Sequence, residues 1–446
     1  MEDQDFVCYA MFVAFFDPVE GNKLEWSITN SNKSPEEKGL LDNVEMTVLA
    51  PGFEKIDEDH VIFQHHSMSN VFGCAAFHKL TTTDPKERFS RMRSVGVMSN
   101  NVSHIHKSIP LLNWLACRVN NNPGDWSLLE KASDVLFSCS QTTNIVSDIE
   151  PFFKVNEEIS PQCLKSTTLS TLSIDHASYL VIWRAVLSQC RVLLFSKSQA
   201  GRLCDMAVLL LKSGCKNSQP LMFRTYDGNE SLFDDSNSSW FAATTDMRLV
   251  LGMGRPSPCW DILIDFDNGN SGAHFKQDDN IIHSVLVRNS NFAPKTISSF
   301  TIHMTGKCDQ RVRQSICKNN LQMWKVVNNP HPLTASSANS ENSDTDYRHQ
   351  YLASWWEKVE SETKAIANME STHPEMKVKK NNAIKVLLRK FAVESSHIPW
   401  LLYICAKFGI DVSGISAVAI MKLKLGLLIG KLTKSTASKK IVPINS

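Results

Sequence analysis

The feature that most constrains the fold lies in the first thirty residues, where an apolar run stops at a turn and then resumes. Residues 6–16 are almost continuously apolar, which is typical of a strand covered on both faces. Asp17-Pro18 interrupts the run, and Gly21-Asn22 supplies residues that tolerate a positive φ. Residues 24–28 then return as a second strand. This pattern predicts a β-hairpin at the centre of a sheet.

More strands and then helices follow this hairpin. The apolar and alternating segments predict three further strands, at 61–63, 71–77 and 92–98. Within the second of these, Gly73 marks a candidate bulge. Apolar residues at helical spacing then predict two helices over 105–119 and 128–135, with Pro110 either in the first turn or at a kink. The order predicts a five-stranded antiparallel layer with flanking helices over residues 1–140.

The middle of the chain has a different pattern, in which helices and buried strands alternate. A largely apolar segment predicts a buried helix over 176–188, with Asp175 as its N-cap. A short strand at 192–195 and a helix at 201–212, capped by Ser198, follow directly. Short connections of this kind indicate a covered parallel sheet. Residues 213–240 are polar and read as an insertion, and further short elements are expected at 240–244, 249–251 and 260–266.

The last part of the chain is predicted to be helical. Residues 328–347, rich in Asn, Ser and Thr, form the clearest linker. Apolar residues then recur at helical spacing in several segments. Pro399 fits the first turn of one helix, and Gly409 fits its C-terminal cap.

Composition places the chain among multi-domain globular proteins. A length of 446 residues predicts two or three domains, and a formal charge of +1 gives no overall bias towards nucleic acid. The acidic start MEDQDFV does not resemble a signal peptide, and no apolar stretch is long enough for a spanning helix. Twelve cysteines are scattered singly without a CxxC pair. We therefore expect reduced thiols in a cytoplasmic protein.

No motif predicts a catalytic, cofactor-binding or metal-binding site. His65-His66 are expected to point to opposite faces of a strand, and the pair His104 and His106 lacks further clustered ligands. Gly252-Met253-Gly254 lacks the rest of a phosphate-binding loop, so a turn is expected there. Neither GxSxG nor HExxH occurs in a supporting context. We therefore predict no cofactor, no metal and no catalytic residue.

Five segments, taken in order, carry a resemblance to a known family. They are FDPVEGNKLEW, RMRSVGVMS, SIDHASYLVIWRAVLSQCRVLLFS, FAATTDMRLVLGMGRPSPCWDILIDFDN and FGIDV. Together they resemble the LCHN-like branch of the DENN-domain family, best over residues 6–140 and 170–270. Two regions depart from the family pattern, namely the polar insertion 213–240 and the segment after Val412.

The resemblance implies a fold and an activity. The implied fold class is α/β, with a longin-like α+β module at 1–145, an α/β central DENN module at 165–327, a flexible linker at 328–347 and a helical downstream part at 348–446. The implied activity is guanine-nucleotide exchange on a Rab-type small GTPase in membrane traffic. Such an activity requires no covalent chemistry, so the chain is an enzyme only in this sense. The alternative is a GTPase-binding or trafficking adaptor of the same fold without exchange activity.

Two further hypotheses concern particular segments. Asp175 is the one residue named as a candidate for the GTPase interface, although a plain N-cap explains it as well. Residues 415–434 mix aliphatic side chains with lysines, which suggests peripheral contact with a vesicle membrane. Lys424 and Lys431 fall on one side of such a helix, but Lys422 falls nearly opposite. An α/β enzyme that uses a nucleotide is the remaining alternative, and no motif supports it.

Overall fold

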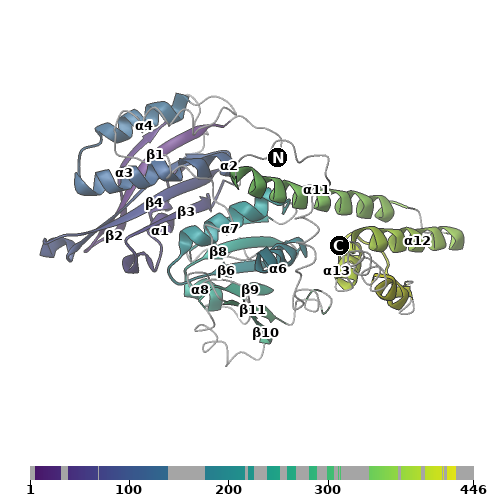
Figure 1. The fold of residues 1–446 in the computed structure, drawn as a ribbon. Coiled ribbons are helices and arrows are strands. Elements are labelled where there is room, and N and C mark those ends of the chain that lie inside the picture. Colours follow the sequence, from purple (N-terminus) through teal and green to yellow (C-terminus); the bar gives the residue numbers. More distant parts are fainter. Residues whose placement is uncertain are drawn as a thin grey trace, which may run out of the picture.

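The structure is a computed structural model that describes most of the chain in separate blocks. The described residues are 6–31, 39–68, 70–138, 176–215, 219–225, 239–251, 259–267, 281–288, 299–305, 310, 312, 341–369, 373–392, 397–413, 415 and 419–427. Within them, eleven strands form one mixed sheet, covered by helices and continued by a helical C-terminal part (Figure 1). The fold class is therefore α/β with a helical C-terminal part.

The first five strands are antiparallel neighbours, as the sequence predicts. They are β1 (Cys8–Asp17), β2 (Gly21–Thr29), β3 (Glu58–Gln64), β4 (Phe72–Thr81) and β5 (Ser90–Ser99). In space their order is β3-β4-β5-β1-β2. Local hydrogen bonds stabilise the turn between β1 and β2. The Asp17 carboxylate accepts the backbone N–H groups of Val19 and Glu20 at 2.7 and 2.9 Å. Gly21 follows with a φ of 86°.

Two details of this layer differ from the prediction. The hairpin lies at the end of the sheet and not at its centre, because β2 pairs only with β1 while β5 occupies the other side of β1. Gly73 is not a bulge, since its pairing with Phe63 and Met98 is regular. Its lack of a side chain serves packing instead, because a Cβ at Gly73 would lie 2.1 Å from the ring of Phe63.

Helices cover this layer. The helices α3 (Ile109–Asn121) and α4 (Ser127–Ser138) lie together on one face, with α3 packed across β4 and β5 (Figure 1). Pro110 occupies the first turn of α3, where no backbone N–H is lost from the helix. The short elements here are α1 (Val44–Val48), η1 (Phe53–Lys55), η2 (Pro85–Glu87), α2 (Val102–Ile105) and η3 (His106–Ser108).

The middle of the chain supplies the parallel part of the sheet, which together with its helices is called the second layer below. Its elements are α6 (His176–Leu187), β6 (Val192–Phe195), α7 (Ala200–Lys212), β7 (Gln219–Phe223), β8 (Trp240–Thr244), α8 (Met247–Leu251) and β9 (Ile262–Asp265). The strands β7, β8, β6 and β9 are parallel neighbours in this order. Two antiparallel strands, β10 (Ile281–Arg288) and β11 (Ser299–Thr305), extend the sheet beyond β9.

Two predictions for this part need correction. The predicted insertion 213–240 contains β7, which forms the link between the two halves of the sheet. Ser198 does not cap α7, because the helix begins at Ala200 with Gln199 at the N-cap position and without a capping bond from its side chain. A residue from the first layer, which is the antiparallel part of the sheet formed by β1–β5, takes this role, as described below.

The C-terminal part is helical, as predicted. It contains α11 (Glu341–Ala367), α12 (Pro374–Phe391), α13 (His397–Lys407) and a helix over 419–427. The helix α11 begins inside the segment predicted as a linker, whose remaining residues 328–340 lie outside the described residues. At the end of α13, Gly409 has a φ of 73° and donates to Ala406, while Ile410 donates to Cys405. This is a Schellman cap, as the sequence predicts.

A cluster of tryptophans joins the C-terminal helices to α6 of the second layer. The rings of Trp355 on α11 and Trp183 on α6 lie 6.0 Å apart, and Trp355 stacks on Trp400 of α13 at 6.4 Å. Trp400 also donates its indole N–H to the hydroxyl of Ser188 at 2.9 Å. Large aromatic side chains bury much apolar surface, so this cluster fixes α11 and α13 against α6. Across the described residues, no helix is both long and apolar enough to cross a membrane.

Candidate functional site

The carboxyl edge of the parallel strands is the first candidate for a functional site. Loops that follow parallel strands meet at this edge, which is where α/β sheets generally bind ligands. Ser196 and Lys197 follow β6, Thr245 and Asp246 follow β8, and Asp267 follows β9. The sequence order separates these residues by up to 71 positions, yet the sheet topology brings their loops together.

Asp267 organises the loops after β6 and β9. Its carboxylate accepts the Ser196 hydroxyl at 2.9 Å and the Lys197 backbone N–H at 2.6 Å. Its own backbone N–H donates to the Asp265 carboxylate at 2.9 Å. These bonds hold the Lys197 loop in a defined conformation, because every partner is itself attached to the end of a buried strand.

Cationic side chains surround this edge. The Arg248 guanidinium binds the buried Asp246 carboxylate, with a shortest distance of 2.7 Å, and its side chain remains 47% exposed. Arg202 on α7 lies over the ring of Phe266 at 6.0 Å. Burial lowers the pKa of Arg202 to about 10, although the charge of Asp267 opposes this shift, so the guanidinium stays charged at neutral pH. The edge therefore offers arginine and lysine side chains suited to polar recognition.

The first layer contributes to the same edge. The Thr245 hydroxyl donates to the backbone carbonyl of Pro51 at 2.8 Å. Gly52 has a φ of 101°, and a Cβ there would lie 2.3 Å from the carbonyl oxygen of Lys197. Glycine is therefore required for this close approach. The exposed Pro51 and the half-buried Lys197 thus lie side by side, so the candidate surface is composite.

Behind this edge, α7 is docked on β3 by bonds between the two layers. The strands β3 and β7 share a single paired position, Phe63 with Phe223. Beside it, the Ile62 backbone N–H lies 3.2 Å from the Cys204 thiol, which in turn donates to the Ile62 carbonyl at 3.7 Å. The thiol therefore satisfies the backbone groups of Ile62 where the sheet gives them no partner strand.

The start of α7 is capped from the first layer. The Asp59 carboxylate on β3 accepts the Gly201 backbone N–H at 2.9 Å. A Cβ at Gly201 would lie 2.3 Å from this carboxylate oxygen. Burial raises the pKa of Asp59, and His60 together with backbone N–H groups limits the rise. A carboxylate at a helix N-terminus offsets the partial positive charge there, so the cap stabilises α7 and its docking together.

One carboxylate and two histidines form a hydrogen-bonded cluster at this junction. Oδ1 of Asp205 on α7 lies 3.0 Å from Nε2 of His60 on β3 and 3.2 Å from Nε2 of His106 in η3. Burial opposes the charge on His60, but the charge and hydrogen bond of Asp205, with the charge of Asp59, raise the pKa of His60 overall. Burial also opposes the charge on Asp205, but the two histidines hold its pKa well below the usual range.

The residues singled out from the sequence do not, as a group, form this junction. Asp175 lies outside the described residues, as does Gly252-Met253-Gly254. His106 is bound to Asp205. The prediction for His65 and His66 was wrong, because their rings lie 4.4 Å apart. The alternation of side chains stops where β3 ends at Gln64, so the expected opposite faces do not apply.

Sequence reasoning missed the residues that hold the junction. Two adjacent pairs, Asp59-His60 and Cys204-Asp205, form it. One signal was present, because Asp205 is the single acidic residue in the apolar helix α7. Among the residues that the structure describes, no group of three or more His, Cys, Asp or Glu side chains is placed to hold a metal ion. The arrangement suits docking and recognition and provides no nucleophile with an adjacent base.

Comparison with known proteins identifies the family. The sequence model described as DENN domain-containing protein 11 matches residues 11–276, which include both layers of the sheet up to β9. The DENN domain-containing protein 11 of Rattus norvegicus is 25% identical over 203 residues, which are 44% of this chain and 42% of the relative. The protein of the same name from Xenopus laevis is 26% identical over 277 residues, which are 58% of this chain and 60% of the relative.

The alignments thus cover less than two thirds of each of these relatives. The family match itself spans more than half of this chain and contains the candidate edge from Pro51 to Asp267. It also contains the Asp59, His60 and Asp205 junction. The chain therefore belongs to the DENN domain-containing protein 11 family.

Proposed function

We propose that the chain is a guanine-nucleotide exchange factor that promotes GDP release and GTP loading on a Rab-type small GTPase in membrane traffic. Membership of a DENN-domain family supports this class of activity. The proposal includes a longin-like module at 1–145, a central DENN module at 165–327 and a helical part at 348–446. It also includes a cytoplasmic location with peripheral contact at vesicle membranes through residues 415–434.

An exchange factor acts through differential binding and not through covalent chemistry. It binds the nucleotide-free GTPase more tightly than the GDP-bound form, and linkage makes this preference reciprocal. Reversing a population from 1:99 to 99:1 requires about 5.5 kcal/mol of differential affinity. An interface that fits a displaced switch loop, and does not fit the closed loop, supplies such a difference. A rigid surface serves this purpose because it does not adapt to the closed loop.

The observation that carries the proposed surface is the composite edge of the sheet. Pro51 and Gly52 of the first layer lie against Lys197 and Thr245 of the second, and Asp267 holds the Lys197 loop. The junction of α7 with β3 lies directly behind and fixes the two layers relative to one another. Charged side chains beside a composite seam suit a partner that must be held in one orientation.

A release assay tests the exchange activity. A panel of Rab proteins is loaded with fluorescent GDP, the chain is added with excess GTP, and loss of fluorescence is followed. Faster release on one member is expected. Binding without faster release on any member would favour the adaptor. If no member binds, the proposed GTPase partner is wrong.

Paired variants then test the surface. The double change Lys197→Ala and Arg248→Ala is expected to lower the exchange rate about tenfold or more, as the loss of interface anchors does. The control is Lys131→Ala with Lys358→Ala, which removes two exposed cations from α4 and α11. Equal rates for both double variants would place the GTPase elsewhere.

Asp175 has a separate test that distinguishes an interface role from a cap. Serine caps helices about as well as aspartate but carries no charge. Asp175→Ser should therefore keep the stability of the chain. If Asp175 contacts the GTPase, this variant lowers the exchange rate, and if Asp175 is only a cap, the rate is unchanged.

A further inference from the structure

Positive charge is concentrated on two C-terminal helices that pack together. The helix α12 carries six Lys or Arg residues and one Glu, and the 419–427 helix carries two Lys and no acidic residue. These 27 residues thus hold eight of the 47 basic residues and one of the 46 acidic residues, so they carry +7 while the remainder of the chain carries −6. The near-neutral total conceals this separation of charge.

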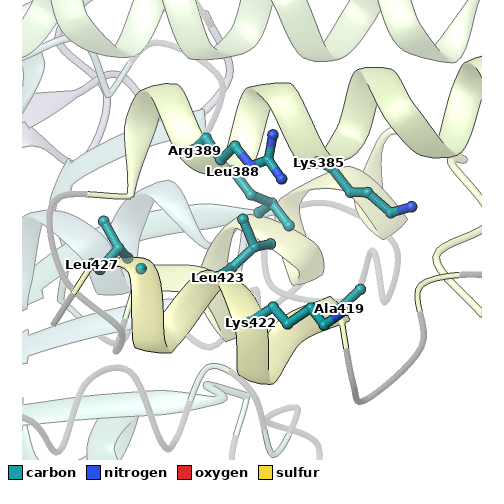
Figure 2. A pocket seen from close by; sticks show the side chains of 8 residues that line it. Lys385, Leu388, Arg389, Ala419, Lys422, Leu423 and Leu427 are labelled. Atoms are coloured by element: carbon teal, nitrogen blue, oxygen red, sulfur yellow. The ribbon is translucent and has the colours of Figure 1, made fainter. Parts of the chain in front are cut away.

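A groove of about 560 Å³ lies between these helices (Figure 2). Its lining combines an apolar floor with cations, and contains no acidic side chain. Leu388 of α12 and Leu423 point toward one another across it. The lining residues are Lys385, Leu388, Arg389, Ala419, Lys422, Leu423, Gly426 and Leu427.

The cations of the groove are largely free of internal partners. Among the described residues, Arg389 and Lys422 form no hydrogen bond or ion pair. Lys385 makes one weak contact, at 3.4 Å from the amide oxygen of Asn382. By contrast, Lys390 on the same helix is paired with Glu362 of α11. Unpaired cations beside buried leucines attract an anionic ligand, because nothing in the lining neutralises them.

The outer side of the 419–427 helix adds an exposed apolar surface. Met421 and Leu425 are 67% and 55% exposed, while Leu423 is buried. At about 100° per residue, Met421 and Leu425 lie nearly opposite Leu423, with Lys422 and Lys424 about 80° to either side of that outer face. From the sequence, Lys422 did not fit an interfacial helix, because it falls nearly opposite Lys424 and Lys431. The buried position of Leu423 shows that Lys422 and Lys424 flank the exposed apolar residues.

We propose that this surface, the groove between α12 and the 419–427 helix together with the outer face of that helix, binds anionic phospholipid at a membrane surface. The phosphate and carboxylate groups of the lipids pair with Lys385, Arg389 and Lys422, while Met421 and Leu425 enter the apolar layer. Charge complementarity favours this occupant. The segment of this chain that follows, residues 428–446, carries four lysines and no acidic residue, so its charge does not complement the groove.

This inference deepens the membrane contact included in the proposed function, and it does not depend on exchange activity. Vesicle binding is measured with the full chain and without any GTPase, so a failure here leaves the exchange assay to be decided separately. Likewise, a chain that binds vesicles but releases no GDP supports this inference alone.

The experiment is flotation of the full chain with two kinds of vesicle, phosphatidylcholine alone and phosphatidylcholine mixed with phosphatidylserine. Binding to the mixed vesicles alone is expected, and it should weaken with added salt. The triple variant Lys385→Gln, Arg389→Gln and Lys422→Gln should lose about a hundredfold in affinity, because each cation near an anionic surface contributes roughly fivefold. Met421→Ser with Leu425→Ser should weaken binding without changing the salt dependence.

The control variant removes the same charge elsewhere, through Lys55→Gln, Lys131→Gln and Lys358→Gln. These three exposed lysines lie on η1, α4 and α11. Circular dichroism and thermal unfolding verify that each variant folds. Equal loss of binding in the control and the groove variant would overturn the proposal, since total charge alone would then explain it. Absence of vesicle binding, with capture of an acidic amphipathic peptide that depends on the groove cations, would overturn it in favour of a protein partner.

Discussion

Replacing Asp205 by asparagine should weaken the junction between the two layers in a way that depends on pH. Asparagine keeps an oxygen that accepts a hydrogen bond from neutral imidazole but removes the charge that His60 and His106 face. The Asp205 side chain is only 16% exposed, so solvent screens little of the lost interaction. Two hydrogen bonds to a charged group contribute about 1.5–3 kcal/mol each, and asparagine retains part of both. The expected loss is about 2–3 kcal/mol where His60 is protonated.

The direction of the pH dependence follows from the pKa shifts of His60 and Asp205. The pKa of His60 is raised on folding, so its contribution to stability is fully present below its unfolded pKa of about 6.5 and is lost as pH rises through the folded value. The pKa of Asp205 is lowered, so its contribution is present above its unfolded pKa and is lost as pH falls towards the folded value. Asp205→Asn should therefore destabilise most between about pH 4.5 and 6.5, and less as pH rises through the folded pKa of His60.

Urea denaturation of both proteins at about pH 6 and pH 8.5 measures this difference, and hydrogen exchange of α7 amides locates the loss. The matched control is Asp134→Asn, which removes an exposed carboxylate from α4. Asp59 also faces His60, so its own substitution must be compared at both pH values. An equal loss for Asp205→Asn at both pH values, or a similar loss for the control, would refute the charge-based account of the junction.

Three other predictions test the packing. Gly52→Ala should lower the free energy of unfolding by about 2–3 kcal/mol in urea denaturation, because the residue has a φ of 101° and its Cβ would meet a backbone carbonyl of the β6–α7 loop; an unchanged midpoint would contradict that close approach. Gly96→Ala should cost about 1–3 kcal/mol in the same assay, since its Cβ would lie 2.3 Å from the ring of Phe12, and Phe12→Leu should restore part of the loss. Burial raises the pKa of Cys405 to about 12, so alkylation followed by mass spectrometry should label the half-buried Cys117 of the native chain well before Cys405; equal rates would show that the C-terminal helices open readily.

Local patterns in the sequence predicted most elements because their causes are local. The Asp17 carboxylate closes the first turn through bonds to residues two and three positions away. Pro110 lies in a first turn, and Gly409 ends α13, because each position requires a backbone conformation that its residue type favours. The alternation of helices and buried strands in the middle of the chain indicated the α/β class, and the family resemblance agreed with it.

The tertiary structure decided which strands are neighbours and where charges meet. Pairing of Phe63 with Phe223 joins the antiparallel and the parallel strands into one sheet. The bond between His60 and Asp205 spans 145 positions. Neither can be read from periodicity, because the free energy of a long-range contact depends on the packing of whole elements. The same reason moved the hairpin to the edge of the sheet and turned Lys422 toward a groove. The sequence by itself determined the elements and their order, and the packing of those elements determined the junction and the charged groove.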